Sequence, residues 1–170
     1  IFDIRGYPRN TVYKISEYIM PFKSVFSLTY EPDLNYPGLF IYKDTIEVGP
    51  DKYNSNYYKG KVVLLVNNRT QSHGEFTCMA LQKAPDVITI GNQTSGADGN
   101  VSEVILPGNI KTRFSGIGIA YPDGTETQRV GVKIDFKVPI TKVGIQNKED
   151  EILISALKYL KSKMFKTKIF

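Results

Sequence analysis

The sequence predicts an α/β fold with a mainly parallel sheet and a C-terminal helix. Residues 61–66 (KVVLLV) form an unbroken apolar run, which is typical of a strand that is buried on both faces. Residues 72–82 have the length and apolar content of a helix, and residues 87–90 (VITI) return as a strand. A strand, a helix and a strand in this order predict a right-handed βαβ unit with parallel strands. The glycine-rich loop at residues 91–100 is then expected at the same end of the sheet as the turn at residue 72. Residues 149–163 carry apolar positions at helical spacing behind an acidic first turn, which predicts a packed terminal helix.

The other elements are predicted from shorter patterns. Residues 11–20 should form a helix, because apolar residues recur there at spacings of three and four. Residues 31–59, rich in tyrosine, proline and glycine, are expected to be largely irregular, with one short strand. The predicted strands outside the βαβ unit lie at residues 1–5, 25–30, 39–42 and, as a hairpin about a Pro-Gly-Asn turn, 101–106 and 110–119.

Composition limits the classes of function. With 170 residues, of which 41% are hydrophobic and 23% charged, residues 1–170 are expected to form a single soluble domain. No segment approaches the roughly 18 apolar residues of a membrane span. The single cysteine, Cys78, and the single histidine, His73, exclude an internal disulfide and a Cys- or His-rich metal site, so we expect neither a metal nor a cofactor.

The chain carries a net charge of +5, concentrated near its end. The basic residues concerned are Lys158, Lys161, Lys163, Lys166 and Lys168. A run of this kind is typical of a solvated helix face, and no aromatic residues alternate with it in a binding pattern, so we expect no nucleic-acid partner. Because residue 1 already lies inside a strand-like segment, we also expect this sequence to be part of a longer protein.

Ser72 is the candidate functional residue, at the turn between the buried strand and the helix. Ser72 and Glu75 have the spacing of a capping box, in which each side chain binds the backbone amide of the other residue. That spacing alone favours a cap. A serine at this position is also a candidate nucleophile, because helix N-terminal amides, with that of His73 nearest, can stabilise an oxyanion. The His73 ring is poorly placed as a base for Ser72, since helical neighbours point about 100° apart.

A set of motifs gives this interpretation more weight. In order, they are IFDIR (1–5), VN (66–67), QSxxE (71–75), IGxxTxG (90–96), LPG (106–108), YPDG (121–124) and GVKIDFKV (131–138). Together they resemble the C-terminal processing (tail-specific) family of serine peptidases over nearly the whole chain. The resemblance implies a crotonase-like core of stacked ββα units and peptide-bond cleavage through an acyl-enzyme. It also implies a polypeptide substrate, cut near protein C-termini.

The resemblance assigns roles to particular positions. Ser72 falls on the nucleophile, His73 on the residue whose amide contributes to the oxyanion hole, and Glu75 on an orienting or capping residue. Gly96 and Ala97 fall on the substrate-binding loop. Many relatives have a lysine base at the position of Ala97, so a Ser/Lys dyad is absent here.

The sequence is therefore similar to the tricorn-like branch, which takes its histidine from an upstream segment. In that branch the acidic residue lies close to the position of Gln128. The catalytic domain would then be completed by a segment before Ile1, and residues 1–170 alone should have little activity. Relatives of this kind often carry a substrate-tethering PDZ domain upstream. The family is commonly periplasmic or secreted. Two alternatives stay open: a binding module that has lost catalysis, and a crotonase-like acyl-thioester enzyme.

Overall fold

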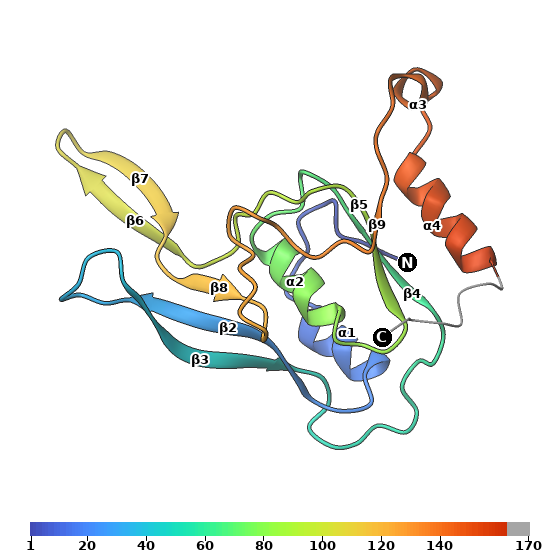
Figure 1. The fold of residues 1–170 in the computed structure, drawn as a ribbon, viewed down its shortest axis with the longest axis horizontal. Helices are drawn as coiled ribbons and strands as arrows, with labels where there is room; N and C mark the ends of the chain where they lie inside the picture. Colours follow the sequence, from blue (N-terminus) through green and yellow to red (C-terminus); the bar gives the residue numbers. More distant parts are fainter. Residues whose placement is uncertain (163–170) are drawn as a thin grey trace.

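The computed structural model describes residues 1–162 of the 170-residue chain. Its central sheet has the strand order β1-β4-β5-β9, and every pair in it is parallel (Figure 1). The strands are β1 (Phe2–Asp3), β4 (Val62–Val66), β5 (Val87–Gly91) and β9 (Phe136–Lys137). Helix α2 (His73–Leu81) connects β4 to β5, so the predicted parallel pair and its connecting helix are confirmed.

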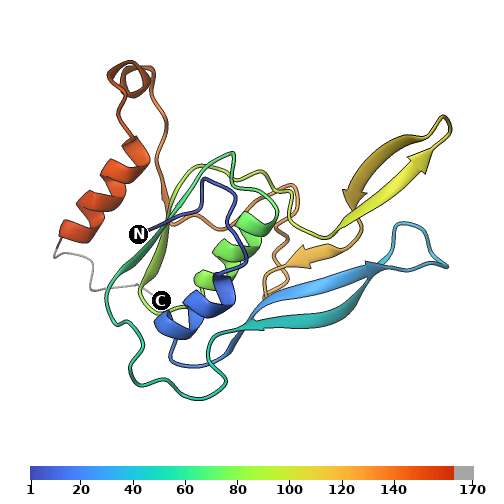
Figure 2. The ribbon, with the colours of Figure 1, turned by 180° about the vertical axis from the view of Figure 1, so that it is seen from behind.

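The apolar run of β4 is explained by burial on both faces of the sheet. Val62, Leu64 and Val66 belong to a core shared with α1 (Val12–Ile19) and α2. Val63 and Leu65 belong to a second core, shared with α4 (Glu151–Lys161). Helices therefore cover both sides of the sheet, as Figure 2 shows from behind. This arrangement is the one expected of a parallel sheet.

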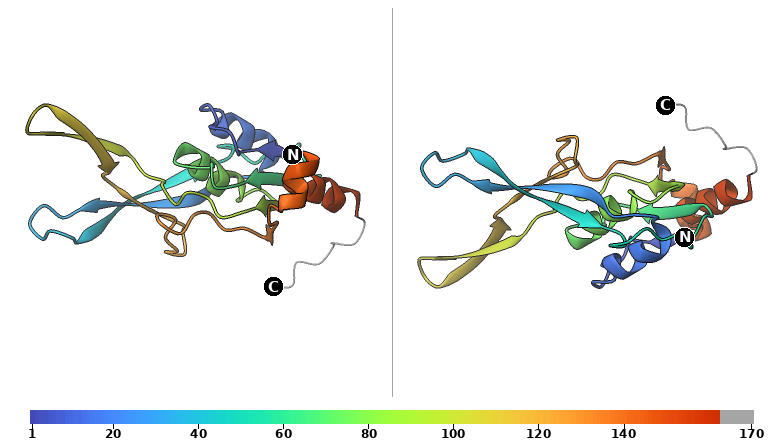
Figure 3. Two further views of the ribbon diagram at one scale, coloured as in Figure 1. Left: turned by 90° about the horizontal axis from the view of Figure 1, so that it is seen from above. Right: turned by 90° about the horizontal axis from the view of Figure 1, so that it is seen from below.

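A second, antiparallel sheet lies beside the first, with the order β3-β2-β8. It contains β2 (Ser24–Pro32), β3 (Phe40–Val48) and β8 (Gly118–Ala120). A separate hairpin is formed by β6 (Val101–Leu106) and β7 (Ile110–Ser115). The tips of the β2–β3 and β6–β7 hairpins project from the same side of the molecule and spread apart (Figure 3).

Two sequence predictions are corrected here. Residues 31–59 are not largely irregular, because Phe40–Val48 is a nine-residue strand that pairs along β2. The second strand of the hairpin ends at Ser115 rather than 119, since Gly118–Ala120 pairs with β2 instead of β6. Strand β9 and the short helix α3 (Lys142–Asn147) were not predicted.

The terminal helix is confirmed as α4, which ends at Lys161. Lys163, Lys166 and Lys168 of the predicted basic run lie outside the described residues. Within residues 1–162, no helix is long and apolar enough to cross a membrane.

Candidate functional site

Ser72 adopts an unusual backbone conformation at the turn between β4 and α2. Its φ of 49° and ψ of −121° lie in a region that residues with a side chain rarely occupy. Holding a residue there costs about 1–3 kcal/mol. An ordinary helix N-cap has extended backbone dihedrals, so capping does not account for this conformation. Strained serines of this kind occur where a strand-to-helix turn exposes a nucleophilic hydroxyl.

The predicted capping box is present, but the Ser72 hydroxyl is not firmly held by it. The Ser72 amide donates a hydrogen bond to Glu75 Oε2 at 3.2 Å. On the other side of the box, the Ser72 side chain faces the Glu75 amide without completing a capping hydrogen bond. Ser72 is also partly exposed, so its hydroxyl remains available for other contacts.

Glu75 joins this turn to the glycine-rich loop that follows β5. Its side chain is fully buried. Its Oε1 accepts hydrogen bonds from Thr94 Oγ1 at 2.6 Å and from the Gly96 amide at 2.7 Å, and its Oε2 accepts from the Ala97 amide at 2.8 Å. Ser72 and the Gly96–Ala97 segment are thus bound to one carboxylate, and the two loops meet at one edge of the sheet as the sequence predicts.

Gly96 is required by the close approach of the chain on its other side. Its φ is 63°, and a Cβ atom added there would lie 2.7–2.8 Å from the backbone of Arg129. The Arg129 amide donates to the Gly96 carbonyl at 2.6 Å. A side chain at this position would therefore separate the loop from residues 127–131 and weaken the wall beside Ser72.

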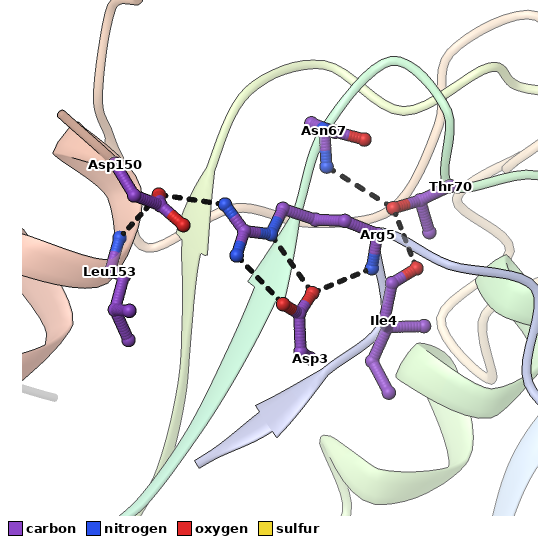
Figure 4. A network of polar contacts seen from close by, with 7 residues as sticks. All are labelled: Asp3, Ile4, Arg5, Asn67, Thr70, Asp150 and Leu153. Carbon is purple, nitrogen blue, oxygen red and sulfur yellow. Dashed lines mark hydrogen bonds and ion pairs between the residues drawn. The ribbon is translucent and has the colours of Figure 1, made fainter. Parts of the chain in front are cut away.

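The segment before Ser72 is fastened to β1 through Thr70. The Thr70 hydroxyl donates to the Ile4 carbonyl at 3.0 Å and accepts from the Asn67 amide at 3.1 Å (Figure 4). Next to Ile4, the Arg5 guanidinium binds the carboxylates of both Asp3 and Asp150 at 2.7 Å. Strand β1, the turn and the N-terminus of α4 therefore share one polar network.

The His73 side chain points to a different part of the surface from the Gly96–Ala97 loop. Its ring stacks on Phe76, with 5.7 Å between centroids, and lies 6.3 Å from the ring of Tyr7. These side chains line a cavity of about 770 Å³. The Nε2 atom of His73 is buried and has no hydrogen-bond partner among residues 1–162. The imidazole thus packs among aromatic rings.

A second cavity, of about 800 Å³, lies on the Gly96–Ala97 side of the turn. Gln128 supports its wall by donating through Nε2 to the carbonyls of Asp98 and Ile117, each at 2.8 Å. Ala97 lines the cavity and offers no side chain that could accept a proton. Gln128 acts here as a support for the loop.

Asp98 is the residue of this region that the sequence did not reveal. The residue is 3% exposed, and its Oδ1 accepts from the Gly99 amide at 2.8 Å. Oδ2 has no hydrogen-bond partner in the described part of the chain. Burial, reinforced by the negative charge of Glu75, raises the pKa of Asp98 to about 7. A lone aspartate in a glycine-rich loop looks solvated by its pattern, and no periodicity marked it as buried.

Strand β4, the strained turn at Ser72 and helix α2 form a strand–turn–helix unit of the kind that carries a nucleophilic serine in α/β enzymes. Residues 11–138 match the model of peptidase family S41, and the chain belongs to that family. No curated protein matches the sequence at significant similarity.

Several solved structures share the fold. A candidate peptidase from Parabacteroides merdae is 21% identical with a TM-score of 0.79, and the match covers 89% of this chain and 47% of that one. The photosystem II D1 C-terminal processing protease is 19% identical with a TM-score of 0.56, covering 85% of this chain and 36% of that one. The tricorn protease is 16% identical with a TM-score of 0.53, covering 93% of this chain and 14% of that one. This chain therefore spans less than half the length of each.

Proposed function

We propose that the protein containing this chain is a serine peptidase that hydrolyses peptide bonds through an acyl-enzyme on Ser72. The observation that carries the proposal is the strained backbone of Ser72 at the strand-to-helix turn, which lies between a cavity lined by His73 and a cavity lined by Ala97. Membership of peptidase family S41 supports the same reaction class.

In the proposed reaction the Ser72 hydroxyl attacks the carbonyl carbon of the scissile bond. The negative charge that develops on the carbonyl oxygen is stabilised by the His73 amide and the positive end of the α2 dipole. Glu75 keeps the turn and the Gly96–Ala97 loop in register during this step. The serine proton passes to a base and then to the leaving amine, and water releases the acyl group.

The base is proposed to come from the part of the protein that precedes Ile1. Ala97 supplies no lysine, and the His73 ring packs against Phe76. We propose that an upstream histidine takes this role, with Gln128 close to the supporting acid position. Residues 1–170 alone are then expected to show little peptidase activity.

A fluorophosphonate probe on the full-length protein tests the nucleophile. We expect labelling of the wild type and none of the Ser72→Ala variant. Ser95→Ala is the matched control, because Ser95 is an exposed serine of the neighbouring loop, whose hydroxyl donates to the Asn68 carbonyl. Labelling that persists in Ser72→Ala, or a full-length wild type that never labels, would contradict the proposal.

The second candidate is a binding module on the same fold that has lost catalysis. It is favoured by Ala97, which stands where a base would act, and by the two cavities on either side of the turn. This reading predicts that peptides or apolar ligands bind equally well to the wild type and to Ser72→Ala. It also predicts that neither protein is labelled by the probe.

The finer properties of the enzyme follow the family resemblance. We propose cutting near protein C-termini, a periplasmic or secreted location, a crotonase-like arrangement of ββα units, and an upstream PDZ domain that tethers the substrate. Cleavage of one peptide with a free and with an amidated C-terminus tests the first point. Equal rates for the two would argue against recognition of the terminal carboxylate.

A further inference from the structure

The cavity on the Gly96–Ala97 side of Ser72 has features that select an occupant. The residues that line it include Tyr30 and Phe40 from the second sheet, together with Asp98. Three glycines among its lining residues, Gly96, Gly118 and Gly124, leave its volume of about 800 Å³ unfilled by side chains. We call it the Asp98 cavity.

The acceptor capacity in this region is not used up. Glu75, the other buried carboxylate of the region, accepts four hydrogen bonds, from Thr94, Gly96, Ala97 and Ser72. Asp98 accepts one, from the Gly99 amide, and its Oδ2 is buried without a partner among residues 1–162. A buried carboxylate oxygen that lacks a donor is costly, so a ligand that brings a donor would be favoured.

We propose that the Asp98 cavity binds a lysine or arginine side chain of the peptide substrate, with its cationic group at the Asp98 carboxylate. The aliphatic stem would lie along the rings of Tyr30 and Phe40, which also attract cations through their faces. This inference rests on the proposed peptidase function and specifies its substrate.

The charges around Asp98 are consistent with a cationic occupant. Glu75 adds a second negative charge behind the loop, and Cys78, buried in α2, is an uncharged thiol because burial raises its pKa. The cation on the lining, Arg129, is 88% exposed and lies 3.6 Å from the carboxylate of Glu126. The cationic group of a bound lysine or arginine would thus supply the positive charge that Arg129 does not bring to Asp98.

The position of the cavity links it to the reacting serine. Ala97, which lines the cavity, donates to the same Glu75 oxygen as Ser72. Ser72 itself does not line the cavity, so the side chain held by Asp98 would belong to a substrate residue on the Gly96–Ala97 side of the serine. The preference should appear in binding as well as in cleavage.

Binding to the full-length Ser72→Ala variant tests the inference without depending on catalysis. Fluorescent peptides that differ at one position, with arginine, lysine, norleucine or glutamate, are titrated and followed by anisotropy, with that position moved along the peptide. We expect the dissociation constants of the arginine and lysine peptides to be at least about tenfold lower than that of the norleucine peptide. If the norleucine peptide binds as tightly as the arginine and lysine peptides at every position tested, the inference is overturned.

Asp98→Asn in the same background should remove the preference, so that the arginine, lysine and norleucine peptides bind with similar affinity. Glu126→Gln is the control, since Glu126 is an exposed carboxylate on the lining of the same cavity. A preference that survives Asp98→Asn and disappears in Glu126→Gln would assign the cation to Glu126 and refute the inference.

The pH dependence gives a readout that requires no Asp98 variant. A cation is attracted by the ionised carboxyl, and the pKa of Asp98 is raised to about 7. The ratio of arginine to norleucine affinity should therefore increase between pH 6 and pH 8 and then level off. A constant ratio over this range would contradict the inference.

The fluorophosphonate test of the proposed peptidase does not depend on this cavity. Labelling at Ser72 without a preference for basic peptides would reject the assignment of the Asp98 cavity and leave the proposed peptidase function in place.

Discussion

The amide of Ser72 and the carboxylate of Glu75 are joined by a hydrogen bond of 3.2 Å that runs back across the first turn of α2. The same carboxylate also binds the Gly96 and Ala97 amides from the loop after β5. This hydrogen bond, of a kind that usually caps the N-terminus of a helix, here also helps to set the distance between the two walls of the site. One buried acidic residue therefore couples the stability of the helix to the geometry around Ser72.

Replacing Glu75 by glutamine should be strongly destabilising. The amide group of glutamine would face four hydrogen-bond donors with a single acceptor oxygen, leaving buried donors unpaired. We expect the free energy of unfolding to fall by about 2–4 kcal/mol. Urea denaturation followed by circular dichroism measures it. Glu149→Gln, at an exposed glutamate, is the control and should change the stability by less than about 0.5 kcal/mol.

The strain at Ser72 predicts a difference between two substitutions that both remove the hydroxyl. Glycine adopts a positive φ without cost, whereas alanine keeps the Cβ atom and the strain. After allowance for the greater freedom of glycine in the unfolded chain, Ser72→Gly should be about 0.5–2 kcal/mol more stable than Ser72→Ala. Thermal or urea unfolding of the two variants tests this. Equal stability would mean that the turn relaxes once the serine is removed.

The parts of the fold that were predictable are those in which local pattern and tertiary environment agree. Residues 62–66 are apolar throughout because both faces of β4 are covered, and this pattern identifies a central parallel strand. The Ser72–Glu75 spacing located the start of α2 for a similarly local reason. The meeting of the two polar loops then followed from parallel strand order.

The parts that were missed depend on pairing between distant segments. Residues 40–44 are exposed in the structure, so β3 has no apolar alternation to mark it, and its partner β2 holds it in place. Strand β9 has only two residues, Phe136 and Lys137, and exists through its register with Ile90 and Gly91. Asp98 is buried by contacts with distant residues, among them Gln128, which lies 30 residues further along the chain and donates to the Asp98 carbonyl.

The ion-pair network at Arg5 should make the protein sensitive to acid. Hydrogen bonds to Arg5 lower the pKa of both Asp3 and Asp150 below their ordinary value of 3.8. A carboxyl whose pKa is lower in the folded state stabilises the fold above pH 3.8, and that contribution is lost as the pH falls further. Arg5→Gln should therefore be less stable than the wild type at pH 7 and lose less stability on acidification.

The size of that effect is limited by exposure, because half of the Asp3 side chain and 38% of that of Asp150 remain exposed. We expect a loss of about 1 kcal/mol at pH 7, measured by urea denaturation between pH 2.5 and pH 7. Arg113→Gln, which removes an exposed arginine 3.7 Å from Glu103, is the control and should have little effect. If the free energy of unfolding of Arg5→Gln falls with decreasing pH as steeply as that of the wild type, the ion pairs of Arg5 contribute little to folding.

Asp98 should act on stability in the opposite direction. Its pKa in the folded state is about 7, above the ordinary value of 3.8, so the folded protein keeps a proton that the unfolded chain releases between these pH values. Its contribution to the free energy of unfolding therefore decreases as the pH rises from about 4 to about 7, and it is constant above that range. Asp98→Asn removes this dependence and should be more stable than the wild type at pH 8, by an amount on the order of 1–4 kcal/mol. Urea denaturation at several pH values measures the slope, with Asp86→Asn as the exposed control. A wild type whose stability does not fall over this range relative to Asp98→Asn would mean that Asp98 is ionised in the folded protein, with a donor already at its carboxylate.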